Sequence, residues 1–205
     1  MVLRMSTSTE QPSEQTADLL QAVLSNLATV VGGITDAQLL HPTPCTQYDV
    51  KQLRDHIVGW LTNFAAGLTD PGGHARADID GYSTPADAEQ EVRAAADRLR
   101  QALQAGAADR PLRLGESAMP GELALGMILW EYQVHGWDLA RATGQPWSPP
   151  DAAARESLSF APGMLSDDYQ GEGKPFGKPV EVPADASPLE CLVALSGRDP
   201  NWQPA

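Results

Sequence analysis

The sequence is poor in cysteine and in positive charge, and each shortage limits what the protein can be. Cys45 and Cys191 are the only cysteines in 205 residues and form no CxxC pair, so in a reducing cytosol we expect two free thiols and no disulfide. Aspartate and glutamate outnumber lysine and arginine by 27 to 14, which gives a formal net charge of −13. Because no basic cluster is present to contact phosphates, we do not expect nucleic-acid binding.

The sequence also lacks long apolar runs. No run reaches the roughly 18 residues that a membrane-spanning helix requires, so no membrane partner is expected. Residues 1–14 are polar and rich in serine and threonine, without the apolar stretch of a secretory signal peptide. With 42% hydrophobic and 20% charged residues, the composition is that of a globular protein, which we expect to be cytoplasmic.

Four long segments carry apolar residues at three- and four-residue steps, the pattern of helices that bury one face. Asp49 and Gln52 have the spacing of a capping box at the start of the second helix, and Ser83-Thr84-Pro85 is a start signal for the third. Gly144 ends the fourth. The pattern predicts helices at residues 14–31, 49–70, 83–104 and 120–143.

Little strand pattern lies between these segments, so the sequence predicts an all-α fold. The expected class is a four-helix bundle formed by residues 14–145, preceded by a disordered N-terminal arm at residues 1–13. Residues 146–205 are expected to form a short irregular C-terminal extension packed on the bundle. The extension is predicted to carry one or two short helices, at residues 151–158 and 189–195.

Three residues of the second and fourth helices point to a metal site. Glu131 and His135 are one helical turn apart and project in the same direction, and His56 lies on the apolar face of the second helix. Bundle cores commonly hold metals with ligands from facing helices. Two imidazoles and one carboxylate leave a coordination position open, as in catalytic zinc sites, and the same set binds non-haem iron. The ligand types therefore do not distinguish between zinc, iron and nickel.

Each of these residues also has a structural explanation. His56 could be a hydrogen-bonded core histidine, and Glu131 with His135 could be an ion pair within one helix. A glutamate buried without a cation would be costly, which favours the metal. Asp49, Asn63 and Asp138 share the ligand stripes and could orient the imidazole N–H groups, with helix capping or solvent contact as the alternative. We interpret Cys45 as a small buried residue rather than a nucleophile.

Two motifs resemble those of a known family. Residues 43–50 (TPCTQYDV) with 55–59 (DHIVG) are similar to its second-helix motif, and residues 131–144 (EYQVHGWDLARATG) to its fourth. Residues 182–188 and 195–200 resemble its tail. The family is the small metal-binding proteins similar to the N-terminal domain of mycothiol-dependent maleylpyruvate isomerase, within the DinB-like four-helix superfamily. The resemblance implies a DinB-like bundle and zinc ligands at the matching positions, which are His56, Glu131 and His135.

The resemblance further implies a thiol-dependent metalloenzyme. Mycothiol would be the low-molecular-weight cosubstrate, used for S-transfer or isomerisation, and the partners would be this thiol and an electrophile. The isomerase has a second full domain that this chain lacks after its fourth helix, so the substrate stays open. The alternatives are a non-catalytic, stress-related metal-binding protein and a metal-dependent hydrolase. The sequence identifies no general base, and it leaves a monomer and a homodimer equally open.

Overall fold

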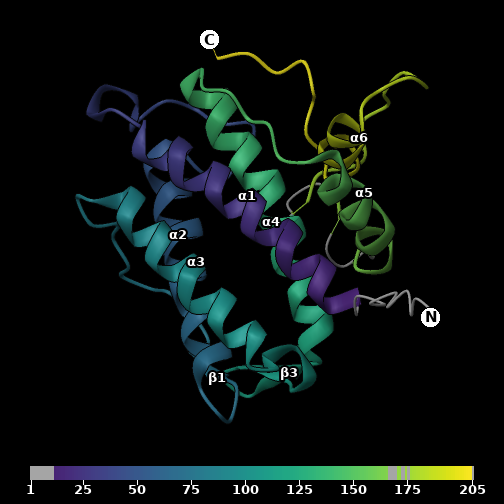
Figure 1. Ribbon diagram of the computed structural model, residues 1–205. Coiled ribbons are helices and arrows are strands. Elements are labelled where there is room, and N and C mark those ends of the chain that lie inside the picture. The colour runs from purple at the N-terminus through teal and green to yellow at the C-terminus, as the bar shows by residue number, and fades with distance from the viewer. Residues whose placement is uncertain (1–11, 166–169, 172–173, 175, 205) are drawn as a thin grey trace, which may run out of the picture.

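The computed structural model describes residues 12–165, 170–171, 174 and 176–204. Within them the chain is mostly helical, with a small three-stranded sheet at the lower end of the helices in Figure 1. The helices are α1 (Pro12–Gly32), α2 (Val50–Thr69), α3 (Ala88–Gln104), α4 (Gly121–Thr143), α5 (Asp151–Phe160) and α6 (Pro188–Leu195). The strands are β1 (His74–Ala75), β2 (Leu112–Leu114) and β3 (Ser117–Met119).

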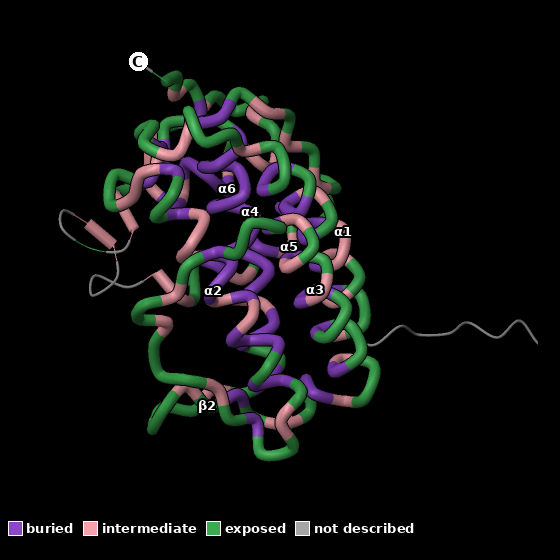
Figure 2. The backbone as a smooth tube through the Cα atoms, turned by 90° about the vertical axis from the view of Figure 1, so that its left-hand side faces the viewer, coloured by how far each residue is buried: buried purple, intermediate pink, exposed green. Residues whose placement is uncertain are grey.

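The four long helices bury their apolar stripes against one another. Helix α1 packs on α3 and α4, and α2 packs on the same two helices. Figure 2 shows the buried positions along the inner sides of these helices. The core is built from aliphatic side chains that are fully buried, among them Leu20, Leu24, Leu27, Leu53, Ile57, Leu61, Leu99, Leu125, Ile128 and Leu129. Burial of these stripes is the main force that holds the helices side by side.

The predicted boundaries of α2 and α4 are close to those observed. The Asp49 carboxylate accepts a hydrogen bond from the Gln52 backbone N–H at 2.8 Å, and the Gln52 side chain accepts one from the Asp49 N–H at 3.0 Å. The predicted capping box is therefore confirmed. Gly144 follows the last residue of α4 with φ +68°, a left-handed conformation that favours glycine.

The starts of α1 and α3 differ from the prediction. Helix α3 begins at Ala88 rather than at Ser83, and Asp87 caps it by accepting from the Gln90 N–H at 3.2 Å. The Thr84 N–H instead donates to the Asp55 carboxylate at 3.0 Å, which ties the segment before α3 to α2. Helix α1 begins at Pro12, so residues 12–13 are helical and not part of a disordered arm. Residues 1–11 of that arm lie outside the described residues.

The small sheet lies where the sequence predicted only connections. Strands β1 and β2 are parallel and β2 and β3 are antiparallel, with Gly115 at φ +61° in the turn between the last two. Strands of two or three residues are too short to show a period of two, so the alternation that identifies a strand is absent. The strict all-α prediction was wrong at this point.

The C-terminal segment packs on α4. Helix α5 contacts α4 and α1, and α6 contacts α5 and α4. The Trp130 ring of α4 stacks on Phe176 with their centroids 4.5 Å apart, and its Nε1 donates to the Ser196 hydroxyl at 3.0 Å. Cys45 and Cys191 are free, as predicted. In the part of the chain that the structure describes, none of the helices is both long and apolar enough to cross a membrane.

The first turn of α4 gives a test of this packing. A Cβ at Gly121 would lie 2.4 Å from the carbonyl oxygens of Ala108 and Arg110, so Gly121→Ala forces backbone apart. We expect the free energy of unfolding to fall by about 1–3 kcal/mol, measured by denaturant titration. Gly163→Ala is the control, because a Cβ there meets nothing within 4 Å, and a change within about 0.5 kcal/mol is expected. Equal stability of the two variants would contradict the packing described.

Candidate metal centre

Two helices bring the three predicted ligands together. His56 comes from α2, while Glu131 and His135 come from successive turns of α4. One ligand atom from each lies within 4.8 Å of the other two. The Tyr132 hydroxyl donates to the Ile57 carbonyl at 3.2 Å, which fixes the two helices in register beside the cluster. The side chains of His56 and Glu131 are 22% and 24% exposed and that of His135 only 9%, so the cluster is open on one side.

The separations within the cluster fit a shared metal ion. The Nε2 atoms of His56 and His135 each lie 3.4 Å from Oε1 of Glu131. This is long for a hydrogen bond to a carboxylate, which is commonly about 2.8 Å. Two atoms bonded to a tetrahedral zinc at about 2.0–2.1 Å lie about 3.3 Å apart. The two distances are therefore compatible with ligands of one metal ion, and the donor set of two imidazoles and a carboxylate is one that zinc accepts.

The outer nitrogens of both imidazoles have partners as well. His135 Nδ1 lies 2.9 Å from Oδ2 of Asp138, and His56 Nδ1 lies 3.4 Å from the Tyr48 hydroxyl. An ionised carboxylate only accepts hydrogen bonds, so a neutral His135 carries its proton on Nδ1. Its Nε2 then keeps a lone pair that points toward Glu131. This is the arrangement by which proteins orient histidine ligands of metals.

The electrostatics of the cluster keep Glu131 ionised. Burial alone would raise the pKa of this carboxyl, but when His135 is protonated its positive charge, together with a hydrogen bond from His56, outweighs burial and lowers the pKa below its ordinary value. A carboxylate that binds a metal has to be deprotonated, so the surroundings favour the required form of Glu131. Burial raises the pKa of the nearby Cys45 thiol, which is consistent with its interpretation as a small buried residue.

Of the three residues predicted to orient the imidazoles, one contacts an imidazole and two do not. Asp138 contacts His135, as described above. Asp49 accepts from Gln52 as the cap of α2, and the Asn63 side chain bonds the backbone of Arg76 at 2.9 and 3.0 Å. Neither contacts an imidazole. Residues seven positions from His56 share its stripe but lie two turns away, about 10 Å along the helix, so the prediction for them was wrong.

Other residues beside the cluster were not predicted. Arg198 donates to Asp138 from the far end of the chain, with Nη2 3.1 Å from Oδ2 and Nε 3.4 Å from Oδ1. Cys45, His135 and Asp138 also have potential ligand atoms within 4.8 Å of one another. Arg198 and Cys45 lie in segments that resemble family motifs, which was the only signal in the sequence. Their approach to α4 depends on the tertiary fold.

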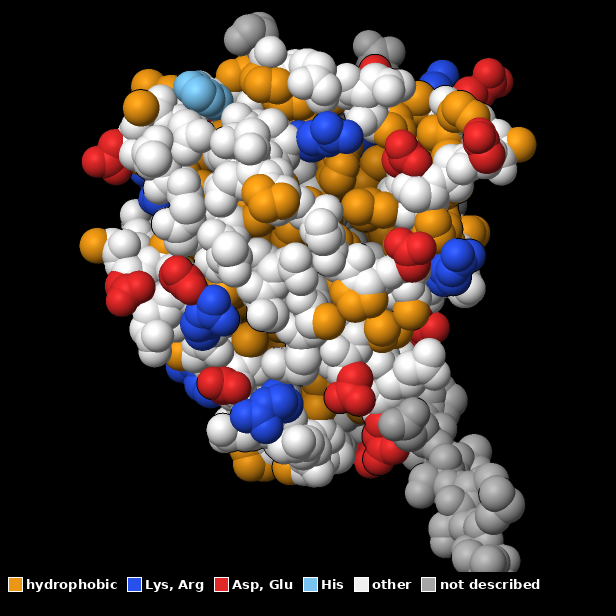
Figure 3. Space-filling view, turned by 45° about the horizontal axis from the view of Figure 1, so that its top comes forward, with side chains coloured by type: hydrophobic (Ala, Val, Ile, Leu, Met, Phe, Trp, Pro, Cys, Tyr) orange, Lys and Arg blue, Asp and Glu red, His pale blue; other side chains and the backbone are white. Residues whose placement is uncertain are grey.

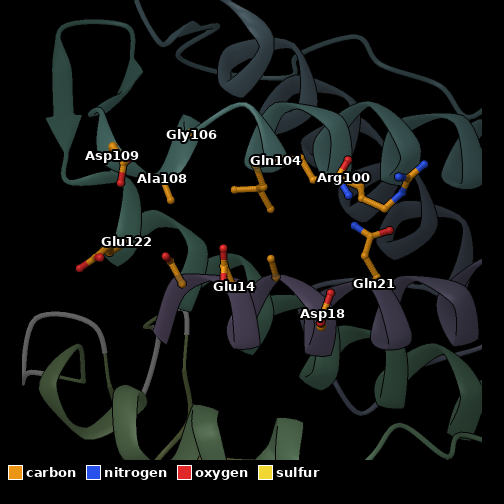
Figure 4. Close-up of a pocket in the computed structure, with 12 residues that line it drawn as sticks. Glu14, Asp18, Gln21, Arg100, Gln104, Gly106, Ala108, Asp109 and Glu122 are labelled. Carbon is orange, nitrogen blue, oxygen red and sulfur yellow. The ribbon is translucent and has the colours of Figure 1, made fainter. Parts of the chain in front are cut away.

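A surface hollow of about 640 Å³ lies away from this cluster. It is formed by the start of α1, the end of α3 and the start of α4, and Figure 4 shows its charged lining. That lining includes Glu14, Asp18, Arg100, Asp109 and Glu122. None of the three candidate ligands lines it. On the face shown in Figure 3, acidic and basic side chains are interspersed rather than gathered into patches of one sign.

The fold and this cluster define a mostly helical protein with a candidate metal centre between α2 and α4. The chain matches the family model "Mycothiol maleylpyruvate isomerase N-terminal domain" over residues 20–140 and belongs to that family, which confirms the resemblance. It is similar to two uncharacterised proteins of Mycobacterium tuberculosis, Rv0738 of strain H37Rv and MT0763 of strain CDC 1551. Each is 30% identical over 174 residues, 83% of this chain and 91% of the relative. No solved structure matches.

The ligand set can be tested by removing one imidazole at a time. We expect wild-type protein to bind about one zinc ion per chain and His56→Ala or His135→Ala to bind much less, because two ligands seldom retain zinc. Metal content after dialysis, measured by mass spectrometry, gives the result. His74→Ala is the control, since His74 is exposed and paired with Asp70 outside the cluster. A His56→Ala protein that binds as much metal as wild type would show the assignment to be wrong.

Proposed function

We propose that the protein is a metal-dependent enzyme that uses zinc and a low-molecular-weight thiol, such as mycothiol, for S-transfer or isomerisation. One observation carries the proposal: two imidazole nitrogens converge on one carboxylate oxygen, each at 3.4 Å, in a member of this family. The donor set supports zinc, and nickel and iron are the other metals that it accepts.

In this proposal His56, Glu131 and His135 hold the metal, and Asp138 orients His135. When bound, a divalent metal lowers the pKa of a coordinated thiol, so that a thiolate is available at neutral pH. The partly exposed edges of His56 and Glu131 give a small molecule access from one side, whereas His135 is buried. The proposed partners are therefore a small thiol and an electrophile that reacts with it.

The remaining parts of the proposal follow from the family and the fold. Family membership and the mutual packing of α1, α2, α3 and α4 support a DinB-like bundle. With α1 beginning at Pro12, the proposed unit comprises residues 12–145, and the described residues after 145 form an extension packed on it. We further propose a cytoplasmic location, a monomer or a homodimer, and no nucleic-acid partner. The formal net charge of −13 supports the last point, because phosphate contacts require a basic surface.

Activity can be tested with zinc-loaded protein, mycothiol and a panel of small electrophiles that includes cis-unsaturated acids. We expect the zinc form to catalyse thioether formation or isomerisation faster than the metal-free protein does. The products are measured by chromatography. Glu131→Gln should lower the rate at least about tenfold, because the amide is a much poorer zinc ligand than the carboxylate.

Glu190→Gln is the matched control for that substitution. Glu190 caps α6 by accepting from the Ser187 N–H at 2.7 Å, a contact that glutamine can also make. The Glu190→Gln protein should therefore keep the wild-type rate. If no electrophile in the panel reacts faster with the zinc form than with the metal-free form, a non-catalytic metal-binding protein is favoured.

A further inference from the structure

The end of the chain reaches the candidate metal centre through one buried side chain. Arg198 lies just after α6 and its side chain is 4% exposed. Its guanidinium bonds both carboxylate oxygens of Asp138, at 3.1 and 3.4 Å, and Nη1 donates to the Ser196 carbonyl at 2.8 Å. Such a two-point contact fixes the orientation of a carboxylate as well as its position.

Asp138 connects this guanidinium to a candidate ligand. Its side chain is fully buried, and its Oδ2 lies 2.9 Å from His135 Nδ1 and 3.1 Å from Arg198 Nη2. One oxygen atom therefore contacts both the imidazole and the guanidinium. A buried carboxylate has few rotamers that satisfy its charge, so the position of Arg198 determines where Asp138 can accept the imidazole N–H.

Arg198 is itself held by an aromatic stack. Its guanidinium lies 5.9 Å from the centroid of the Phe176 ring, and Phe176 stacks on Trp130 at 4.5 Å. Trp130 immediately precedes Glu131 and donates to the Ser196 hydroxyl at 3.0 Å. Only 4% of the Arg198 side chain is exposed, so the guanidinium presents almost no surface to a molecule arriving from solvent. Arg198 is thus placed to act on the centre through Asp138 and not by touching a substrate.

We propose that Arg198 is a positioning residue of the metal centre. By fixing Asp138 it keeps the proton of His135 on Nδ1 and the Nε2 lone pair directed at the space between His56 and Glu131. The inference rests on the metal centre of the proposed function and adds that the C-terminal extension completes it. It differs from a purely structural ion pair because the oxygen that binds Arg198 is also the one that orients His135.

Two measurements on the full chain test this role. The first follows the His135 Nδ1 proton in metal-free, ¹⁵N-labelled protein, where only four histidines need assignment. We expect a protected Nδ1–H in the wild type and exchange with water at least about tenfold faster in Arg198→Met. The second is zinc affinity by chelator competition, which should fall about 10–100-fold in Arg198→Met, as for other groups that orient metal ligands.

Two further variants separate positioning from stability. Arg198→Lys keeps the charge but lacks the two-point contact, so both readouts should fall between those of wild type and Arg198→Met. If Arg198→Met fails to fold, the two measurements on Arg198→Lys test the proposal instead. Arg110→Met is the matched control, because Arg110 also anchors distant backbone, the carbonyls of Leu68 and Asp70, but lies away from the centre. It should lower stability and leave both readouts unchanged.

The proposal is overturned if a folded Arg198→Met or Arg198→Lys protein keeps both the wild-type zinc affinity and the wild-type Nδ1 proton. It is also overturned if wild-type His135 carries its proton on Nε2. Neither readout uses thiol or turnover, so a protein without enzymatic activity leaves this test intact. If the wild type binds no zinc, the proposed metal function fails, while the proton on His135 still decides the role of Arg198.

Discussion

Glu131 places a negative charge between α2 and α4, and the packing around it must keep that charge facing two imidazoles. A carboxylate removed from water costs several kcal/mol unless positive or hydrogen-bonding groups surround it. His56 and His135 offset that cost only while the two helices stay in register. The buried hydrogen bond from Tyr132 to Ile57 joins the residues adjacent to Glu131 and His56, so the same contact that aligns the helices aligns the cluster.

Helix α4 can hold these groups because it is covered on both sides. One face packs in the main core with Ile128 and Leu129, and Trp130 and Val134 on another face belong to a second cluster with α5 and α6. Burial on several faces explains why Gln133 is inside, where its amide donates to the Ser157 hydroxyl at 2.6 Å. His135 and Asp138 therefore lie on a helix that is packed on several faces, and such packed elements hold metal ligands more precisely than loops do.

The sequence predicts the long helices well and the site in part. Periodic burial and local capping are encoded within a few residues, so α2 and α4 and the proximity of Glu131 to His135 follow from spacing alone. That α2 and α4 meet at His56 was inferred from the position of His56 on the apolar face of its helix and from the family resemblance. Contacts between residues far apart in the sequence, such as Arg198 with Asp138 or Thr84 with Asp55, produce no periodic pattern in the sequence. The short strands were missed because two or three residues are too few to show an alternation, and the late start of α3 was missed because the preceding segment is held by a contact across the chain.

The charges of the centre bear on which molecule completes it. Glu131 and Asp138 contribute two negative charges and Arg198 one positive, while histidines that bind metal are neutral, so the bare cluster carries one net negative charge. In the proposed function a divalent cation would reverse this to one net positive charge, and a thiolate would then make the whole assembly neutral. Neutrality matters because unbalanced charge is costly on the buried side of the centre, where Asp138 and Arg198 lie. In the proposed function a neutral ligand such as water would leave the positive charge, so the buried Arg198 would favour an anion such as a thiolate at the metal.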